Sequence, residues 1–188
     1  MLKQIKEYQK YILITGFRDV RIEDAEEFLK IISDKKPSGV EIQFFNAKLV
    51  ATWQHLYFAA LNALTAFKNK MNISKSLAME ILLYASAQRQ IRKAMETMGI
   101  KSETSEMAVL VIGEKPDMVK SALLVVSKHI NAKQDETVLE LLKRKNELIK
   151  KTFEISELEL ETMMKENDLE DAIVSLVIER MALLATQR

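Results

Sequence analysis

The chain has 188 residues, a formal net charge of +1, no cysteine, two histidines and four glycines. Without cysteine it can form no disulfide, thiolate zinc site, iron–sulfur centre or thiol nucleophile. The histidines, His55 and His129, are too far apart for an H-E-x-x-H zinc site, and the glycines are too widely spaced for a dinucleotide-binding fingerprint, a P-loop or a G-x-S-x-G elbow. We therefore expect a non-catalytic binding protein with no catalytic residues, no cofactor and no bound metal.

Composition favours a soluble, helix-rich protein. Hydrophobic residues make up 48% of the chain and charged residues 29%, enough for both a core and a wet surface. Nowhere does an uninterrupted apolar stretch reach the roughly 18 residues that a membrane span needs. The first ten residues alternate lysine with polar residues and lack the apolar stretch of a secretory signal. We expect a cytoplasmic protein, and the absence of cysteine fits a reducing compartment.

Predicted strands alternate with helices in the first half of the chain. The β-branched and aromatic run at 11–15 predicts a strand, and 20–22 can resume extended structure as the second strand of a hairpin. The other elements predicted here are a helix over 23–33, a loop over 35–39, a strand over 40–45, a helix over 53–68, a helix capped by Asn72 or Ser74 that runs to about Ala85, and a shorter helix stopped by Gly99.

The second half begins with a nearly all-apolar run at 107–112, which predicts a central strand. Two helices follow, over 116–130, with Pro116 in the first turn, and over 141–151. A third begins at a capping box of Ser156 and Glu159, and the last runs from Asp168 to about Thr186. Residues 136–139 fit either a short edge strand or the start of a helix. The order predicts an α+β fold: a single domain over 1–188 with a small mixed or antiparallel sheet, several packed helices and a helical C-terminal third.

The small net charge conceals local fields of opposite sign. Seven basic and two acidic residues between Lys68 and Lys101 leave this segment at +5, whereas eight acidic residues and one basic residue between Glu154 and Asp171 leave that segment at −7. Segments of one sign select partners of the other.

The turn at 86–90 is the first candidate site. It places Arg89 between Gln88 and Gln90 just before a helix whose predicted buried face comprises Ile91, Ala94, Met95 and Met98. Free backbone N–H groups at a helix start attract anions, arginine binds phosphate bidentately, and glutamine amides can read base edges. The alternative is an ordinary solvated face in which Arg92 pairs with Glu96 four residues later.

The final helix is the second candidate. Its polar residues form one narrow stripe, so its apolar arc is roughly 240° wide, far more than the ~100° of a surface helix. Either other elements of this chain enclose the helix, or one flank, formed by Val174, Ile178 and Met181, meets another protein. Both possibilities stay open at this point.

Two further features have simpler explanations. His55 lies beside Leu56, Tyr57 and Phe58 and has no acidic or hydroxyl partner at a recognisable spacing, so we expect a packing residue. The acidic residues between Glu23 and Glu27 could suggest a metal site, but the N-terminus of a helix favours acidic residues in any case.

The central region of the chain resembles a known family. It contains Asn46-Ala47-Lys48-Leu49-Val50-Ala51-Thr52, then His55 on an alanine-rich helix, then a segment from Ser76 that ends in Ala85-Ser86-Ala87-Gln88-Arg89-Gln90-Ile91, and it closes at Met98-Gly99-Ile100. This pattern resembles the small regulatory subunit of the KEOPS (EKC) complex, the family of the PRPK-binding protein, and its archaeal branch in particular. The similarity is good from about Tyr11 to Ile112, looser afterwards and poor over 131–167, which we expect to vary within the family.

The resemblance implies a specific role. Such subunits are not enzymes: they bind the N-lobe of the complex's small atypical protein kinase/ATPase, and through it the threonylcarbamoyltransferase subunit, and they stimulate tRNA threonylcarbamoyladenosine modification. In the archaeal branch the subunit also binds the 3′ CCA end of tRNA. On this resemblance, the expected tRNA-binding residues are Lys75, Gln88, Arg89, Gln90 and Arg92. The expected kinase-binding residues are Val174, Ile178 and Met181, together with the helix over 23–33.

Two other functions remain possible from the residues. One is a protein-interaction adaptor that uses the apolar final helix and has no RNA-binding activity. The other is a small-molecule enzyme, which would show a deep pocket with paired carboxylates, or with His55 at a strongly shifted pKa.

Overall fold

Residues 1–164 and 168–186 are described in a computed structural model of the chain. Two units can be distinguished, each built from two stretches of chain: unit 1 is Met1–Ala47 with Gly99–Val138, and unit 2 is Lys48–Met98 with Leu139–Arg188. The strands of the described residues lie in unit 1, and helices make up unit 2. The antiparallel sheet and the helical C-terminal third confirm the predicted α+β class, whereas the single domain over 1–188 stays a prediction.

The sheet of unit 1 has the strand order β1-β2-β4-β3, with β5 also paired to β2. Its strands are β1 (Leu2–Ile5), β2 (Lys10–Arg18), β3 (Glu41–Asn46), β4 (Glu106–Gly113) and β5 (Lys133–Gln134). Strand β2 pairs with β4 along one edge. Its other edge is shared, because β1 pairs with residues 10–13 and β5 with residues 17–18.

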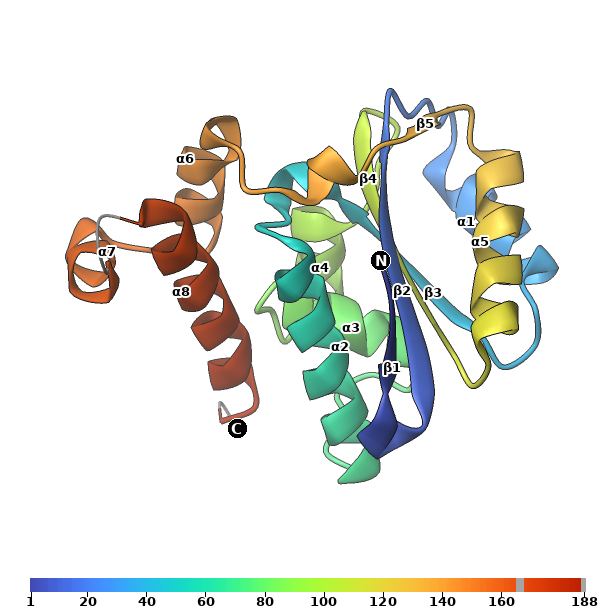
Figure 1. The fold of residues 1–188 in the computed structure, drawn as a ribbon, viewed down its shortest axis with the longest axis horizontal. Coiled ribbons are helices and arrows are strands. Elements are labelled where there is room, and N and C mark those ends of the chain that lie inside the picture. The colour runs from blue at the N-terminus through green and yellow to red at the C-terminus, as the bar shows by residue number, and fades with distance from the viewer. Residues whose placement is uncertain (165–167, 187–188) are drawn as a thin grey trace. The chain divides into compact units, whose positions relative to one another are not determined.

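Two helices, α1 (Ala25–Lys35) and α5 (Pro116–His129), lie side by side on one face of this sheet (Figure 1). The core between them includes Leu13, Phe17 and Val111, and β4 is buried along its whole length, as expected for a central strand. Gly113 ends β4 where α5 comes close: a Cβ there would lie only 3.1 Å from Val119 Cγ2. A larger residue at 113 would therefore push α5 away from the sheet.

The structure differs from the sequence-based prediction in one strand and one hairpin, and it decides an element that the sequence left open. Strand β1 was not predicted because its residues are mostly exposed and lack apolar alternation; its ladder with β2 holds it in place. Residues 20–22 do not form the second strand of a hairpin, although the Val20 N–H donates to Ser105 O at 3.0 Å. Residues Glu136–Leu139, which fitted either strand or helix, form a 3₁₀ turn, η3.

Arg18 holds the segment before η3 against the sheet. Its guanidinium donates to Asp135 at 2.6 Å, to Glu106 at 2.8 Å and to Thr137 Oγ1 at 3.0 Å. The hydrogen bonds from Thr137 and Arg18 hold the pKa of Asp135 well below its usual range. The conformation of this segment thus depends on a residue more than a hundred positions away in the chain.

Unit 2 consists of helices. They are α2 (Trp53–Lys68), α3 (Leu77–Ala85), α4 (Ile91–Met98), α6 (Lys143–Thr152), α7 (Glu157–Met163) and α8 (Leu169–Leu184), and a 3₁₀ turn, η2 (Ala47–Leu49), precedes α2. Helices α2 and α3 pack together, and Ala59, Ala60 and Ala63 of α2 are completely buried. Small side chains at these positions allow helix axes to approach closely. The N-cap of α3 is Ser76, so the prediction of Asn72 or Ser74 is wrong.

His55 lies inside unit 2 with no exposed surface. Its Nδ1 accepts a hydrogen bond from the Ala51 N–H at 3.2 Å, so the ring is neutral and Nε2 donates to Ala85 O at 2.7 Å. The Phe153 ring lies edge-on at a centroid distance of 5.5 Å. Burial, with a smaller contribution from nearby Lys145, lowers the pKa of His55 to about 4. With both nitrogens engaged, the ring is a packing residue, as predicted, and the pKa shift does not mark an enzyme site.

Two negative findings hold for the part of the chain that the structure describes. None of its helices has both the length and the apolar character needed to cross a membrane. Nor do three or more His, Asp or Glu side chains come together there as a metal site; the acidic residues at 24–27 instead surround the start of α1, where Asp24 accepts hydrogen bonds from the backbone N–H groups of Glu26 and Glu27.

The buried imidazole predicts how stability depends on pH. The unfolded chain takes up a proton at His55 near pH 6.5, whereas the folded chain resists this down to about pH 4, so stability falls as pH falls through this window. The full difference corresponds to about 3 kcal/mol. Urea unfolding at several pH values should therefore give a shallower pH dependence for His55→Gln than for the wild type.

The matched control is His129→Gln, which changes the other histidine, at the end of α5. That variant should keep the contribution of His55. An NMR titration in which the His55 ring of the folded wild type protonates near pH 6.5 would contradict the prediction.

Candidate functional site

The turn between α3 and α4 is held in one conformation by its own backbone. The Ser86 hydroxyl donates to Leu82 O at 2.8 Å and to Leu83 O at 3.2 Å. Ala87 has a left-handed backbone with φ of 50°, and the Gln88 N–H donates to Leu83 O at 3.0 Å. This pattern is a helix C-terminus closed by a left-handed residue. It determines the direction in which residues 88–90 leave α3.

Glu80 organises the loop on the other side of α3. Its side chain is completely buried, and its carboxylate accepts from the Ile73 N–H at 3.0 Å and the Ser74 N–H at 2.7 Å. This acid therefore holds the loop in place through hydrogen bonds inside the unit. The loop that it holds carries Lys75, which is exposed.

The five residues expected to bind tRNA lie in or beside these two turns. Lys75, Arg89, Gln90 and Arg92 are exposed, and Gln88 is half-buried. Arg92 Nε forms an ion pair with Glu96 at 2.8 Å, with 91% of the arginine side chain exposed. The i,i+4 pair named as the alternative explanation is therefore present, and such exposed pairs contribute little to stability.

Arg89 borders a cavity of about 270 Å³ in unit 2. Side chains of α2, of the loop after it, of α3 and of the end of α8 line this cavity, including Asn62, Asn69, Tyr84, Met71 and Ile73. Arg89 Nη1 donates to Leu184 O at 3.3 Å, which holds the guanidinium at the rim. Burial, together with Glu80, raises the pKa of Tyr84, so its hydroxyl keeps its proton at neutral pH.

The chemistry of this cavity fits a planar polar group next to an anion. Asn62 and Asn69 offer amide donors and acceptors, and Met71 and Ile73 supply apolar surface that is 49% and 38% exposed. Arg89 adds a cation at the edge. The sequence patterns identified Arg89 but not the other lining residues, because these come from separate elements and share no motif.

The structure does not bring all the predicted residues together. Gln88 lines a different, smaller cavity of about 170 Å³ with Thr152, Glu154 and Arg180. Lys75, Gln90 and Arg92 do not line either of these two cavities.

The predicted buried face of α4 is only half correct. Ala94 and Met98 are buried, as expected, but Ile91 and Met95 are 43% and 47% exposed. Helix α4 is short, and α3 is its main packing partner.

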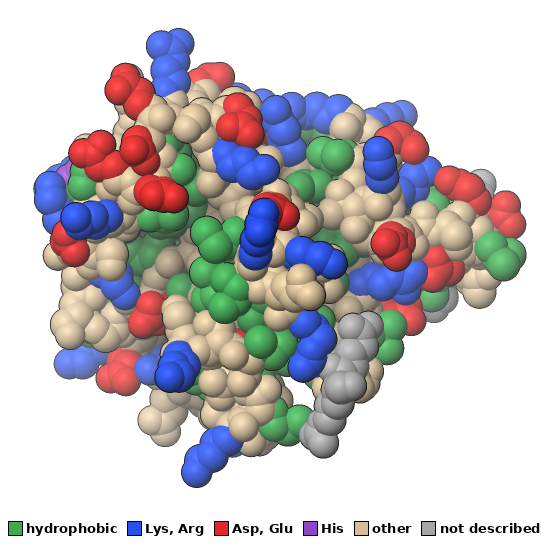
Figure 2. Space-filling view, turned by 180° about the vertical axis from the view of Figure 1, so that it is seen from behind, with side chains coloured by type: hydrophobic (Ala, Val, Ile, Leu, Met, Phe, Trp, Pro, Cys, Tyr) green, Lys and Arg blue, Asp and Glu red, His purple; other side chains and the backbone are tan. Residues whose placement is uncertain are grey.

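The basic residues of the 68–101 segment are divided between the two units. Lys101 belongs to unit 1, whereas the other basic residues of the segment belong to unit 2. Figure 2 shows basic and acidic side chains interspersed over one face, with apolar side chains between them. Attraction of an anion would therefore depend on particular side chains such as Arg89 more than on the segment as a whole.

Helix α8 packs against α2, α3 and α7, which accounts for much of its wide apolar arc. Met181 is completely buried and therefore does not belong to an exposed flank. Val174 and Ile178 are half-buried, and Leu183 is 41% exposed. One side of this helix is therefore core, and a narrower apolar flank stays accessible.

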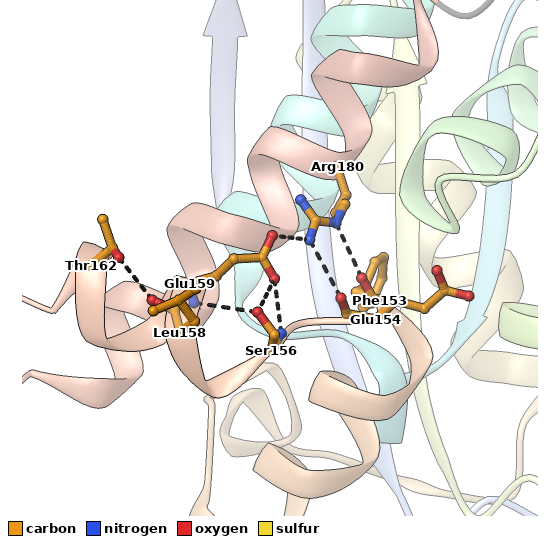
Figure 3. A network of polar contacts seen from close by, with 7 residues as sticks. All are labelled: Phe153, Glu154, Ser156, Leu158, Glu159, Thr162 and Arg180. Atoms are coloured by element: carbon orange, nitrogen blue, oxygen red, sulfur yellow. Dashed lines mark hydrogen bonds and ion pairs between the residues drawn. The ribbon is translucent and has the colours of Figure 1, made fainter.

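Arg180 holds α8 to the segment that joins α6 and α7 (Figure 3). Its guanidinium donates to Phe153 O at 3.2 Å, to Glu154 O at 3.4 Å and to Glu159 at 2.5 Å. Glu159 also accepts from Ser156, which confirms the predicted capping box at the start of α7. The hydrogen bond from Arg180 is the main reason why the pKa of Glu159 is lowered to about 2.

Comparison with known proteins identifies the family. The family described as kinase binding protein CGI-121 matches residues 17–185, a range that runs through the segment 131–167. A protein named regulatory protein Cgi121, from Methanocaldococcus jannaschii, is 33% identical over 144 residues, which cover 77% of this chain and 85% of the relative. These matches confirm the resemblance drawn from the central motif. The chain belongs to the CGI-121 family of kinase-binding regulatory proteins.

Proposed function

We propose that this protein is a non-catalytic, cytoplasmic subunit of a KEOPS complex that binds and stimulates the small atypical protein kinase/ATPase of the PRPK type. Through that kinase it would act with the threonylcarbamoyltransferase subunit on tRNA. We further propose that it recruits tRNA by the single-stranded 3′ CCA end. The observation that carries this second part is the cavity beside Arg89.

Family membership supports the kinase part. On α8, the half-buried Val174 and Ile178 offer an apolar flank, and partial burial within the unit limits how far these side chains can move. Such pre-ordered apolar side chains favour association with a partner surface, because little conformational entropy is lost on binding. The exposed polar residues Ser175 and Glu179 lie next to this flank and would form its wet rim.

The chemistry of the cavity supports the tRNA part. Unpaired RNA bases are recognised by stacking and by hydrogen bonds to their edges, while arginine and lysine bind the phosphates. Asn62 and Asn69 can meet a base edge, and Arg89 stands where an adjoining phosphate would lie. Holding the 3′ end would raise the effective concentration of the rest of the tRNA at a catalytic subunit.

The accessible flank of α8 gives the first test of this proposal. Ile178→Glu places a charge in that flank, so the variant should stay folded by circular dichroism but no longer co-purify with the kinase subunit. Ser175→Glu is the matched control, because it adds the same charge to the exposed stripe of the same helix. A folded Ile178→Glu protein that still co-purifies would remove this flank from the kinase interface.

The rim of the cavity gives the second test. Arg89→Glu should weaken tRNA binding at least about tenfold in filter binding, and wild-type affinity should fall steeply as salt rises. Lys120→Glu makes the same charge change on an exposed residue of α5 and should bind nearly as the wild type. Removing CCA from the tRNA should weaken binding to the wild type but matter little to Arg89→Glu.

An adaptor without RNA-binding activity is the second candidate function. The Arg92–Glu96 ion pair and the interspersed surface charges favour it, because they reduce the positive field available to RNA. Normal kinase binding combined with no measurable tRNA binding would select this function and reject the tRNA part of the proposal.

A further inference from the structure

Unit 1 contains an open cleft that the proposed function does not use. It has a volume of about 550 Å³ and lies between the β1–β2 hairpin and the segment that joins β4 to α5. Most of its lining residues precede residue 17, where the family match begins. The cleft is therefore largely a feature of this chain's N-terminal segment.

Two tyrosines line the cleft. Tyr11 lies on β2 and packs partly against the core of unit 1, while Tyr8 ends the 3₁₀ turn η1 (Lys6–Tyr8) between β1 and β2. Both residues are half-buried, so each side chain is partly packed and partly accessible. Aromatic rings held in this way form stacking surfaces for unpaired bases, and such stacking tolerates any base.

Glutamine amides lie next to these rings. Gln4 is the cross-strand partner of Tyr11 in the β1–β2 ladder, which places it beside the ring on the same face of the sheet. Gln9 is held in a left-handed backbone conformation, with φ of 50°, and its N–H donates to Lys6 O at 3.2 Å. An amide offers both donors and acceptors to the edge of a base.

The charged residues of the cleft leave an excess of positive charge. Lys10 Nζ pairs with Glu114 at 3.0 Å, so this carboxylate is compensated. Lys115, at the N-cap of α5, is exposed and lines the same cleft. A phosphate group would find favourable charge here.

From this combination we propose that the cleft binds an unpaired nucleotide of a single-stranded RNA segment. The base stacks against the rings of Tyr8 and Tyr11, the amides of Gln4 and Gln9 meet its edge, and Lys115 binds the neighbouring phosphate. This site lies in unit 1 and does not involve Arg89, so it is independent of the tRNA 3′-end cavity of unit 2.

The test uses the full chain carrying Arg89→Glu, so that the cavity of unit 2 contributes little. The probe is a fluorescein-labelled octamer of adenosine, which has no CCA end. Its binding is measured by fluorescence anisotropy at low salt. We expect Tyr8→Ala to weaken binding about tenfold, since one stacked base is lost. Tyr8→Phe is the matched control and should bind within about twofold of the parent, because the ring is retained.

Two results would overturn the proposal. The first is no binding of the octamer to the parent protein. The second is equal binding by Tyr8→Ala and its parent; if Lys115→Glu binds more weakly in that case, charge attraction alone accounts for the binding. Each leaves the Arg89 proposal untouched, since that proposal is measured with tRNA on an otherwise wild-type chain.

A second readout covers the case in which Tyr8→Ala fails to fold. The unaltered chain can be crosslinked by ultraviolet light to an octamer of 4-thiouridine, and the adducts located by mass spectrometry. Adducts within Gln4–Tyr11 support the cleft. Adducts confined to other segments contradict it.

Discussion

The two hydrogen bonds of the neutral His55 imidazole are the interaction on which unit 2 most depends. Nδ1 accepts a hydrogen bond from the Ala51 N–H just before α2, and Nε2 donates one to Ala85 O at the end of α3. Two backbone groups at helix ends, which would otherwise be unpaired in the interior, are satisfied by one side chain. Because α3 ends at Ala85, the ring contacts the backbone directly before the turn that carries Arg89. Its contact with Phe153 links the same point to α6, and the Phe153 carbonyl in turn receives Arg180 of α8.

Charge in this chain acts mainly through individual pairs. The acidic segment at 154–171 suggests a single strongly negative region in the sequence. In the structure, however, Glu159 forms an ion pair with Arg180 and caps α7, and Glu157 forms an ion pair with Lys150. In the basic segment, Glu80 is buried against backbone N–H groups. The net charge of a segment is therefore a poor guide to the potential at its surface. Individual cations beside a cavity, such as Arg89, are a better guide to where an anion would be attracted.

Local signals in the sequence predicted the class of fold and most of its elements. Caps such as Ser156 with Glu159, and the apolar run of β4, act over a few residues and can be read without the rest of the chain. Features that depend on distant partners could not be read in this way. Strand β1 exists because β2 offers a free edge, residues 136–139 turn where Arg18 holds the preceding segment, and Met181 is buried because α2 and α3 lie beside α8. The cavity beside Arg89 could not be predicted for the same reason, since its asparagines and its tyrosine come together only in the folded chain.

The interleaving of the two units along the chain governs the order in which they can form on the ribosome. Strand β4 lies between β2 and β3, so the sheet cannot assemble until residue 113 has been synthesised, long after β3 has emerged. Until then the nascent chain carries the apolar side chains of β2 and β3 without their cover, while α2 and α3 are already available to pair with each other. Unit 2 must wait still longer for α8. Exposed strand edges favour aggregation, so the interval between the synthesis of β3 and that of β4 is the stage at which this chain is most exposed to it.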